Sequence, residues 1–261
     1  MKIKILGYIL VCLFGILEAP AQVEESIKKM FQSAQEGNPE SQTALGEYYC
    51  FISTPNYSEA YKWYRKAAEQ DYAAAQYNLG VCYDKGLGVK KNLSEAVKWY
   101  RLAAEQGYAM AQNNLGLCYE NGEGVTINLS EAIKWYRLAA EQGYDEAQNN
   151  LGVCYYKGTG VKRNVHTAIK WYRKAALQGH SLAQRNLGIC YAAGDGIKRN
   201  MVEAVKWFRK AAEQGDAAAQ YNLGVSYEMG DGVRKNTAEA LKWYRKAADQ
   251  GFPYAINALK K

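Results

Sequence analysis

Hydrophobic and polar positions recur along the chain with a period of 36 residues, which the six tryptophans mark at Trp63, Trp99, Trp135, Trp171, Trp207 and Trp243. Such fixed spacing predicts a repeat architecture. The clearest copy, residues 72–107, reads YAAAQYNLGVCYDKGLGVKKNLSEAVKWYRLAAEQG. Further copies occupy 38–71, 108–143, 144–179, 180–215 and 216–251, and the first of these is shortened by two residues in its loop. Residues 22–37 match the second half of a repeat, and residues 252–261 match the first half.

Each repeat contains two amphipathic helical segments. On a helical projection of the first segment, Ala75, Leu79 and Cys82 fall on one face, which we expect to be buried. In the second segment Trp63 and Ala67 share a face, and charged residues occupy the opposite side. The pattern therefore predicts pairs of helices that pack through one face and meet water through the other.

The predicted helix ends recur with the repeat. Asn92 precedes Glu95 by three residues, which is capping-box spacing, and Gly107 stands where a helix ends in the left-handed conformation. The same cap position holds Asn56, Asn92, Asn128, Asn164, Asn200 and Asn236. Between the helices, Gly86 and Gly88 suit a turn with positive φ angles. A phosphate-binding loop would require a preceding strand, and no segment shows the alternation of a strand.

Composition and the N-terminal segment restrict the class of protein. The chain has 261 residues, of which 48% are hydrophobic and 23% charged, so a disordered chain is excluded. Its longest uncharged apolar run, residues 5–17, is shorter than the roughly 18–20 residues of a membrane-spanning helix. Lys2 and Lys4, this apolar run and the triplet from Ala19 to Ala21 together have the form of a secretory signal peptide. We expect cleavage after Ala21 and a secreted or periplasmic protein.

The charge pattern argues against a nucleic-acid partner. The formal net charge is +7, and each second helix carries a lysine with an arginine three residues later, such as Lys62 and Arg65. An acidic residue follows the arginine by four positions in most repeats, as Glu69 follows Arg65. This interleaving favours a solvated, salt-bridged helix face over a basic stripe.

The motif Ala-x-x-x-Leu-Gly-x-x-Tyr-x-x-Gly-x-Gly-Val, followed by Ala-x-x-Trp-Tyr-x-x-Ala-Ala-x-x-Gly, resembles the Sel-1-like repeat, a relative of the tetratricopeptide repeat. The resemblance covers residues 38–251. It implies an all-α fold, a right-handed α/α superhelical solenoid of six 36-residue repeats with half-repeat caps. It also implies an adaptor for other proteins, often exported in bacteria. Because the residues offer few parts of a catalytic constellation, we expect no cofactor and no catalytic role.

Two alternatives remain open. Ser26 and Lys29 have the Ser-x-x-Lys spacing of penicillin-recognising enzymes, and cysteine-rich relatives are linked to β-lactams, which would suit a hydrolase. The companion motifs of those enzymes are absent, so we predict no enzyme. Asn56, Asn92 and Asn128 begin glycosylation sequons, which would suit an endoplasmic-reticulum adaptor like the eukaryotic relative. His166 and His180 lack metal-ligand spacing, and we expect no metal site.

The cysteines divide into two groups. Cys82, Cys118, Cys154 and Cys190 share one inward-facing repeat position, which is held by Ser226 in the last repeat. Equivalent positions of packed helices lie about 8–10 Å apart, beyond disulfide reach, so we expect free buried thiols. Cys50 aligns instead with Asp84 on the outer arc, which predicts one reactive thiol that could also link two copies through a disulfide. The alternative is that the shortened loop covers Cys50.

The positions that differ between repeats are the candidates for partner binding. They lie on the outer arc of the first helices, which line the concave side in helical-pair solenoids. These residues are Tyr77, Asp84, Asn113, Glu120, Asn149, Tyr156, Arg185, Tyr221 and Glu228. An apolar row runs beside them: Val81, Leu117, Val153, Ile189 and Val225. Polar variation over an apolar row suits a protein or an extended peptide segment, although neutral solvent positions would give the same pattern.

Overall fold

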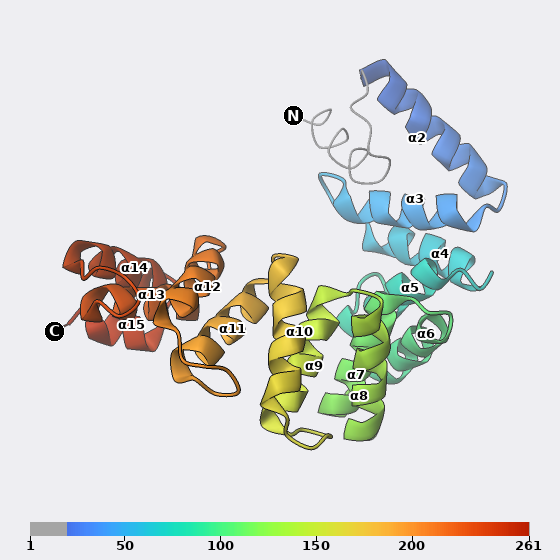
Figure 1. The fold of residues 1–261 in the computed structure, drawn as a ribbon. Coiled ribbons are helices and arrows are strands. Elements are labelled where there is room, and N and C mark those ends of the chain that lie inside the picture. Colours follow the sequence, from blue (N-terminus) through green and yellow to red (C-terminus); the bar gives the residue numbers. More distant parts are fainter. Residues whose placement is uncertain (1–19, 261) are drawn as a thin grey trace. The chain divides into compact units, whose positions relative to one another are not determined.

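The computed structural model describes residues 20–260, and in this range it consists of helices and contains no strand (Figure 1). The helices are α2 (Pro20–Gln35), α3 (Pro39–Phe51), α4 (Tyr57–Ala68), α5 (Ala73–Lys85), α6 (Leu93–Glu105), α7 (Ala109–Asn121), α8 (Leu129–Glu141), α9 (Asp145–Lys157), α10 (Val165–Leu177), α11 (Ser181–Ala193), α12 (Met201–Glu213), α13 (Ala217–Met229), α14 (Thr237–Asp249) and α15 (Pro253–Ala258). The all-α repeat fold predicted from the sequence is confirmed. The expected signal segment, residues 1–21, lies outside the described residues apart from its last two, which begin α2.

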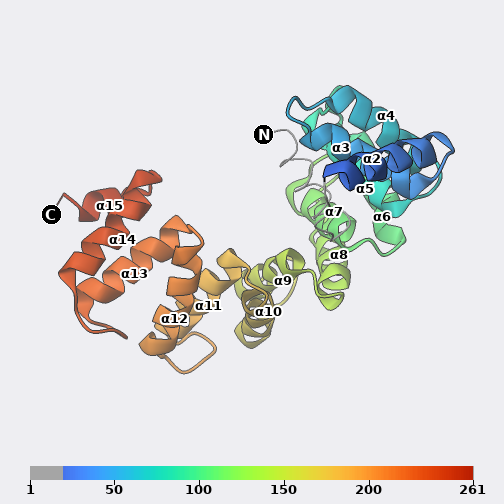
Figure 2. The same cartoon turned by 90° about the horizontal axis from the view of Figure 1, so that it is seen from above.

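The chain divides into two compact units. Unit 1 comprises residues 1–135, described from residue 20, and unit 2 comprises residues 136–261, described to residue 260. In unit 1 the pairs α3/α4 and α5/α6 pack together, and in unit 2 the pairs α9/α10, α11/α12 and α13/α14 do the same (Figure 2). Each pair is one repeat, and the second helix of a repeat also packs on the first helix of the following one.

The helix ends follow the predicted chemistry. The Asn92 side chain accepts a hydrogen bond from the backbone N–H of Glu95 at 3.2 Å, and equivalent bonds form at the other asparagine caps. Gly107 closes its helix with φ of 91°, and Asp71 takes this place in the shortened repeat with φ of 61°. The caps therefore fix where each helix begins and ends.

A glycine in the first helix allows the two helices of a repeat to approach closely. A Cβ on Gly80 would collide with the ring of Tyr100, and one on Gly152 would collide with Tyr172. Each ring thus lies directly on the backbone of the partner helix, next to fully buried leucines such as Leu79. The glycine of the Leu-Gly motif and the tyrosine of the Trp-Tyr motif therefore contact each other within a repeat.

Buried glutamines connect consecutive repeats, a feature that the sequence analysis missed. In unit 2, the Gln184 side chain donates to the carbonyl of Ala176 at 3.1 Å, and Gln214 donates to Gln184 at 2.8 Å. In unit 1, Gln76 donates to the carbonyl of Ala68 of the preceding repeat at 3.4 Å, and within its own repeat it accepts from Gln106 at 2.8 Å. The repeated Ala-Gln and Gln-Gly pairs were the available signal for these bonds.

The arginines of the second helices have partners different from those expected. The predicted bond to the acid four residues later forms at Arg65, which lies 2.8 Å from Glu69. In the next repeat, however, Arg101 donates to the hydroxyl of Tyr119, one repeat ahead, at 2.7 Å. Equivalent bonds join Arg137 to Tyr155, Arg173 to Tyr191 and Arg209 to Tyr227. At Arg101, Arg137 and Arg209 the expectation of an arginine–acid pair was wrong, because helix periodicity shows neighbours on one helix but not on the next; at Arg173 no acid was expected, since Leu177 stands in that place.

Candidate protein-interaction surface

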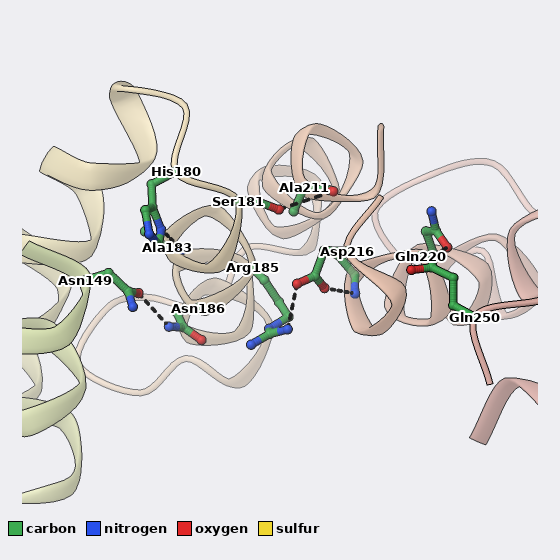
Figure 3. A network of polar contacts seen from close by, with 11 residues as sticks. Asn149, His180, Ser181, Ala183, Arg185, Asn186, Ala211, Asp216, Gln220 and Gln250 are labelled. Carbon is green, nitrogen blue, oxygen red and sulfur yellow. Dashed lines mark hydrogen bonds and ion pairs between the residues drawn. The ribbon is translucent and has the colours of Figure 1, made fainter. Parts of the chain in front are cut away.

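The first helices α9 and α11 of unit 2 form a groove of about 300 Å³, the α9–α11 groove. Its walls are Asn149, Val153, Tyr156, Lys157, Tyr172, Leu182, Arg185, Asn186, Ile189 and Cys190. Asn186 donates to the side-chain oxygen of Asn149 at 3.1 Å, and the two amides point toward one another in Figure 3. This bond joins α9 to α11.

The groove exposes apolar surface beside charged groups. Ile189 is 38% exposed and Leu182 44% exposed, although both are large and apolar. Val153 is half-buried beside them, and the Lys157 side chain is exposed. Tyr172 reaches the groove from α10. An apolar floor with a polar edge is typical of a contact for a side chain of another protein.

Arg185 is held in position by an ion pair. One of its guanidinium nitrogens lies 2.7 Å from the carboxylate of Asp216. The same carboxylate accepts the backbone N–H of Ala219 at 2.7 Å and so caps α13 (Figure 3). The Asp216 side chain is only 7% exposed, whereas Arg185 is 26% exposed. Because a guanidinium carries five donors, Arg185 can still offer N–H groups to a ligand.

The structure brings three of the predicted partner residues, Asn149, Tyr156 and Arg185, into this groove. Asn149 is only 4% exposed, however, and Asn113 is completely buried, so the expectation that both lie on an exposed arc was wrong. A helical projection gives an angle on one helix and cannot include the neighbouring helix; at Asn149 that neighbour contributes Asn186.

The remaining predicted partner residues are distributed over both units. Tyr77 contacts the rings of Tyr100 and Tyr108, and Tyr221 contacts Tyr244, Phe252 and Tyr254. Asp84 and Glu120 are half-buried, and Glu228 accepts a hydrogen bond from the Tyr244 hydroxyl at 2.6 Å. A role of these residues in binding stays a prediction.

A second, larger hollow of about 540 Å³ lies at α12. Two of its lysines already have partners: Lys206 bonds to Glu203, and the Lys210 ammonium lies 4.5 Å from the centre of the Trp207 ring. Because the α9–α11 groove exposes the large apolar side chains of Ile189 and Leu182, it is the better candidate for a ligand despite its smaller volume.

The four inward-facing cysteines are buried as predicted, and Cys50 is half-buried. The Cys50 sulfur lies 3.6 Å from the Tyr64 hydroxyl. Burial raises the pKa of Cys50 above its usual value, and it raises that of Cys118 to about 12. Cys50 is therefore the most accessible of the described thiols, and its reactivity stays a prediction.

Sequence analysis also missed Glu47 of α3. If Gly46 is aligned with Gly80, Glu47 takes the place of Val81 in the apolar row. The Asn78 side chain of α5 forms a hydrogen bond with the Glu47 carboxyl, and burial raises the pKa of Glu47. The substitution of an acid for an apolar residue was the signal that could have revealed it.

The residues named in the hydrolase and metal alternatives lie at helix surfaces and helix ends. Lys29 is 74% exposed and lies 3.9 Å from Glu25. His180 accepts the backbone N–H of Ala183 at 3.2 Å, as a helix cap, and His166 is exposed. Within residues 20–260 no group of three potential ligands could hold a metal ion, and no helix has the length and hydrophobicity to cross a membrane.

Comparison with known proteins gives a consistent result. The model of the Sel1 repeat matches residues 39–72, 73–108, 109–144, 145–180, 181–216 and 217–252. A crystal structure of a Sel1 repeat protein from Oxalobacter formigenes is similar, with 34% identity and a TM-score of 0.78 over 95% of this chain and 97% of that one.

Another similar structure is c5321, described as a protective antigen in uropathogenic Escherichia coli, with 38% identity and a TM-score of 0.81. The match covers 88% of this chain and 50% of c5321. A putative sel1-like repeat-containing protein, L21 of Acanthamoeba polyphaga mimivirus, is 40% identical over 73 residues. That match covers 28% of this chain and 14% of the viral protein, so the chain spans a small part of this relative's length.

Proposed function

The chain belongs to the Sel1 repeat family, whose fold is generally used for protein–protein interaction, and we propose that it is an adaptor for an extended segment of another protein. The segment lies along the first helices and inserts an apolar side chain into the α9–α11 groove. The observation that carries this proposal is the exposed apolar surface of Ile189 and Leu182 inside a walled groove.

The groove favours an extended segment over a folded partner. Its volume of about 300 Å³ is at the lower end of the range for ligand pockets, so it accepts side chains and not a whole domain. The half-buried Asn186 lines the groove, and its side-chain oxygen can accept a hydrogen bond from the backbone of a segment in extended form. Arg185, held by Asp216, offers donors to a carbonyl or carboxylate of that segment.

The adaptor acts outside the cytoplasm in this proposal. The basic start, the apolar run and the small residues up to Ala21 support export to the periplasm or the medium. Expression of the full chain in a bacterium, fractionation and mass measurement of the recovered protein test this part. Recovery from the periplasm or the medium with a chain that begins at Gln22 is expected, and recovery of the full-length chain from the cytoplasm would contradict it.

Binding is tested with a displayed peptide library selected against the purified protein. Ile189→Glu places a charge on the groove floor and is expected to weaken the selected peptides by roughly tenfold or more. Leu177→Glu is the matched control, because Leu177 lies in α10 of the same unit, is 71% exposed and does not line the groove. Equal binding by both variants, with both folded by circular dichroism, would contradict the proposal.

A further inference from the structure

Cationic side chains line the α9–α11 groove on both of its first helices, Lys157 on α9 and Arg185 on α11, and none of the described residues that line it is acidic. Lys157 is exposed, and within residues 20–260 it forms no ion pair. Arg185 bonds to Asp216 through one terminal nitrogen, so its other N–H groups remain available to a ligand. The groove therefore favours a ligand that carries negative charge beside its apolar part.

The acidic residues around this groove do not cancel its charge. Asp216 has both carboxylate oxygens occupied, one by Arg185 and the other by the N-terminal cap of α13. Asp195, which follows α11, lies 2.9 Å from a guanidinium nitrogen of Arg163. Glu146 of α9 is exposed and does not line the groove. The positive charge of the lining thus remains available to a carboxylate of another chain.

The spacing of the two cations matches that of an extended chain. Val153 and Ile189 occupy equivalent positions of consecutive repeats, so they lie at one level of the groove floor. Lys157 follows Val153 by four residues and Arg185 precedes Ile189 by four, which places one cation about 6 Å beyond this level on each side. In an extended segment, side chains two residues apart point the same way and are separated by about 6.6 Å. An apolar side chain on the floor can therefore have a carboxylate two residues away, on either side, that reaches a cation.

We propose that the partner segment has the pattern acid-x-apolar-x-acid. Its apolar side chain lies on Val153 and Ile189, and its two Asp or Glu carboxylates bind Lys157 and Arg185. The assignment rests on the proposed function, because it names the residues of the segment that the groove accepts. The pattern is the same in both chain directions, so it does not depend on which way the segment runs. Because Asp216 already holds the Arg185 guanidinium, binding of a carboxylate there costs little side-chain entropy.

The test compares three blocked peptides. The first is acetyl-Ser-Asp-Ser-Leu-Ser-Asp-Ser-amide, the acidic peptide, and the second has Asn in place of both Asp residues. The third, acetyl-Ser-Ser-Asp-Leu-Asp-Ser-Ser-amide, keeps the charge but places each carboxylate next to the leucine, where it points to the opposite face of an extended chain. Binding to the full chain is followed by NMR through the backbone amide of Ile189. The acidic peptide is expected to bind roughly tenfold more tightly than the Asn peptide and roughly threefold more tightly than the rearranged one, with both differences smaller at high salt.

Variants of the protein test each cation. Lys157→Gln is expected to weaken the acidic peptide by roughly threefold and to leave the Asn peptide unchanged. Lys170→Gln is the matched control, because it removes the same charge from an exposed position of α10 that does not line the groove. Asp216→Asn keeps a capping oxygen for α13 but removes the carboxylate that competes for Arg185, and it is expected to strengthen the acidic peptide by roughly threefold. Partial unfolding cannot produce such a gain.

An unmoved Ile189 signal with the acidic peptide, equal binding of the acidic and Asn peptides, equal binding of the acidic and rearranged peptides, or unchanged binding by Lys157→Gln would each overturn the acidic pattern. If the acidic and Asn peptides move the Ile189 signal equally, the groove still accepts an apolar side chain and the proposed function stands. The proposed function fails separately, if Ile189→Glu has no effect on the peptides selected from the library.

Discussion

One pair of positions on consecutive repeats carries different chemistry in different repeats. In unit 1 the ring of Tyr77 contacts that of Tyr108, and in unit 2 Tyr221 and Phe252 make the same kind of contact. The equivalent residues Arg185 and Asp216, also in unit 2, instead form an ion pair at 2.7 Å. These sites have the same spacing along the chain, so the scaffold fixes where the side chains meet and leaves their chemistry variable.

The neighbouring apolar row shows the same contrast. In unit 2 this row contains Val153 and Ile189, and the latter is exposed in the groove. In unit 1 the row begins with Glu47, which is half-buried next to Asn78. The positions that hold the helices together are repeated in both units, whereas the row includes the exposed Ile189 in unit 2 and a half-buried carboxyl, Glu47, in unit 1.

The largest expected effect tests whether the two units are equally well packed. Trp135 is 8% exposed in the core of unit 1, and Trp243 is 5% exposed in that of unit 2, whereas Trp63 is only half-buried. Replacement of either buried tryptophan by alanine is expected to lower the free energy of unfolding by about 3–5 kcal/mol. Trp63→Ala should cost less.

Urea denaturation of the three tryptophan variants measures these losses, and hydrogen exchange shows which unit opens first. A smaller loss at Trp243 than at Trp63 would mean that distance from the chain end, and not burial, sets the stability of a repeat.

A smaller effect on stability compares the Arg185–Asp216 ion pair with the contact between the Tyr77 and Tyr108 rings. Asp216→Ala removes both the partner of Arg185 and the cap of α13, and it is expected to cost about 1–2 kcal/mol. Asp216→Asn keeps a capping oxygen and should cost less than half of that. Tyr108→Phe in unit 1 keeps the ring contact and should leave stability nearly unchanged. Thermal unfolding of the three variants checks this order, and equal losses at Asp216→Ala and Asp216→Asn would show that the cap does not contribute.

Alkaline pH is expected to destabilise the two units to different extents. Burial raises the pKa of Cys82 and Cys118 in unit 1 to about 12, and that of Cys190 in unit 2 to about 11. The folded state holds these protons above pH 9, where an unfolded thiol releases them, so stability falls as the pH rises from about 9 toward those values. Each thiol contributes at most about 1.4 kcal/mol per pH unit in that window.

Cys118→Ser is the variant that checks the alkaline effect, because Ser226 already occupies this repeat position and donates to the carbonyl of Asn222 at 2.9 Å. The variant should unfold in urea with a weaker dependence on pH between 9 and 11 than the natural chain. An identical pH dependence would exclude Cys118 as a source of the alkaline sensitivity.

The smallest effect concerns access to a thiol and not stability. Cys50 of unit 1 is half-buried, whereas the four cysteines at the repeated position are buried in both units. A maleimide is expected to label Cys50 first in the folded protein, slowly because its pKa is raised, and the others only in denaturant. Peptide mass mapping gives the order. Protection of Cys50 equal to that of Cys118 would show that the shortened loop covers the sulfur.

Local structure was predictable from single residues, whereas contacts between repeats were not. Asn92 and Gly107 indicate a helix start and a helix end because their effects act within one turn. The burial of Asn149 depends on Asn186, which is 37 positions away, and the bond from Arg101 reaches a tyrosine 18 positions ahead. A projection of one helix contains neither neighbour. The predicted exposure of Asn149 and the predicted partner of Arg101 were therefore wrong.

The glutamine bonds between repeats affect how such a chain can change over generations. Gln184 and Gln220 make the same bond to the end of the preceding repeat, with the carbonyl of Ala176 and of Ala212, each at 3.1 Å. If recombination removed residues 181–216, Gln220 would follow His180 at the distance that Gln184 now has. The junction would be rebuilt from identical atoms, while Arg185 and Asp216 would disappear together. Loss or gain of a whole repeat by gene rearrangement can therefore change the side chains on the first-helix face without requiring a compensating mutation in the junction.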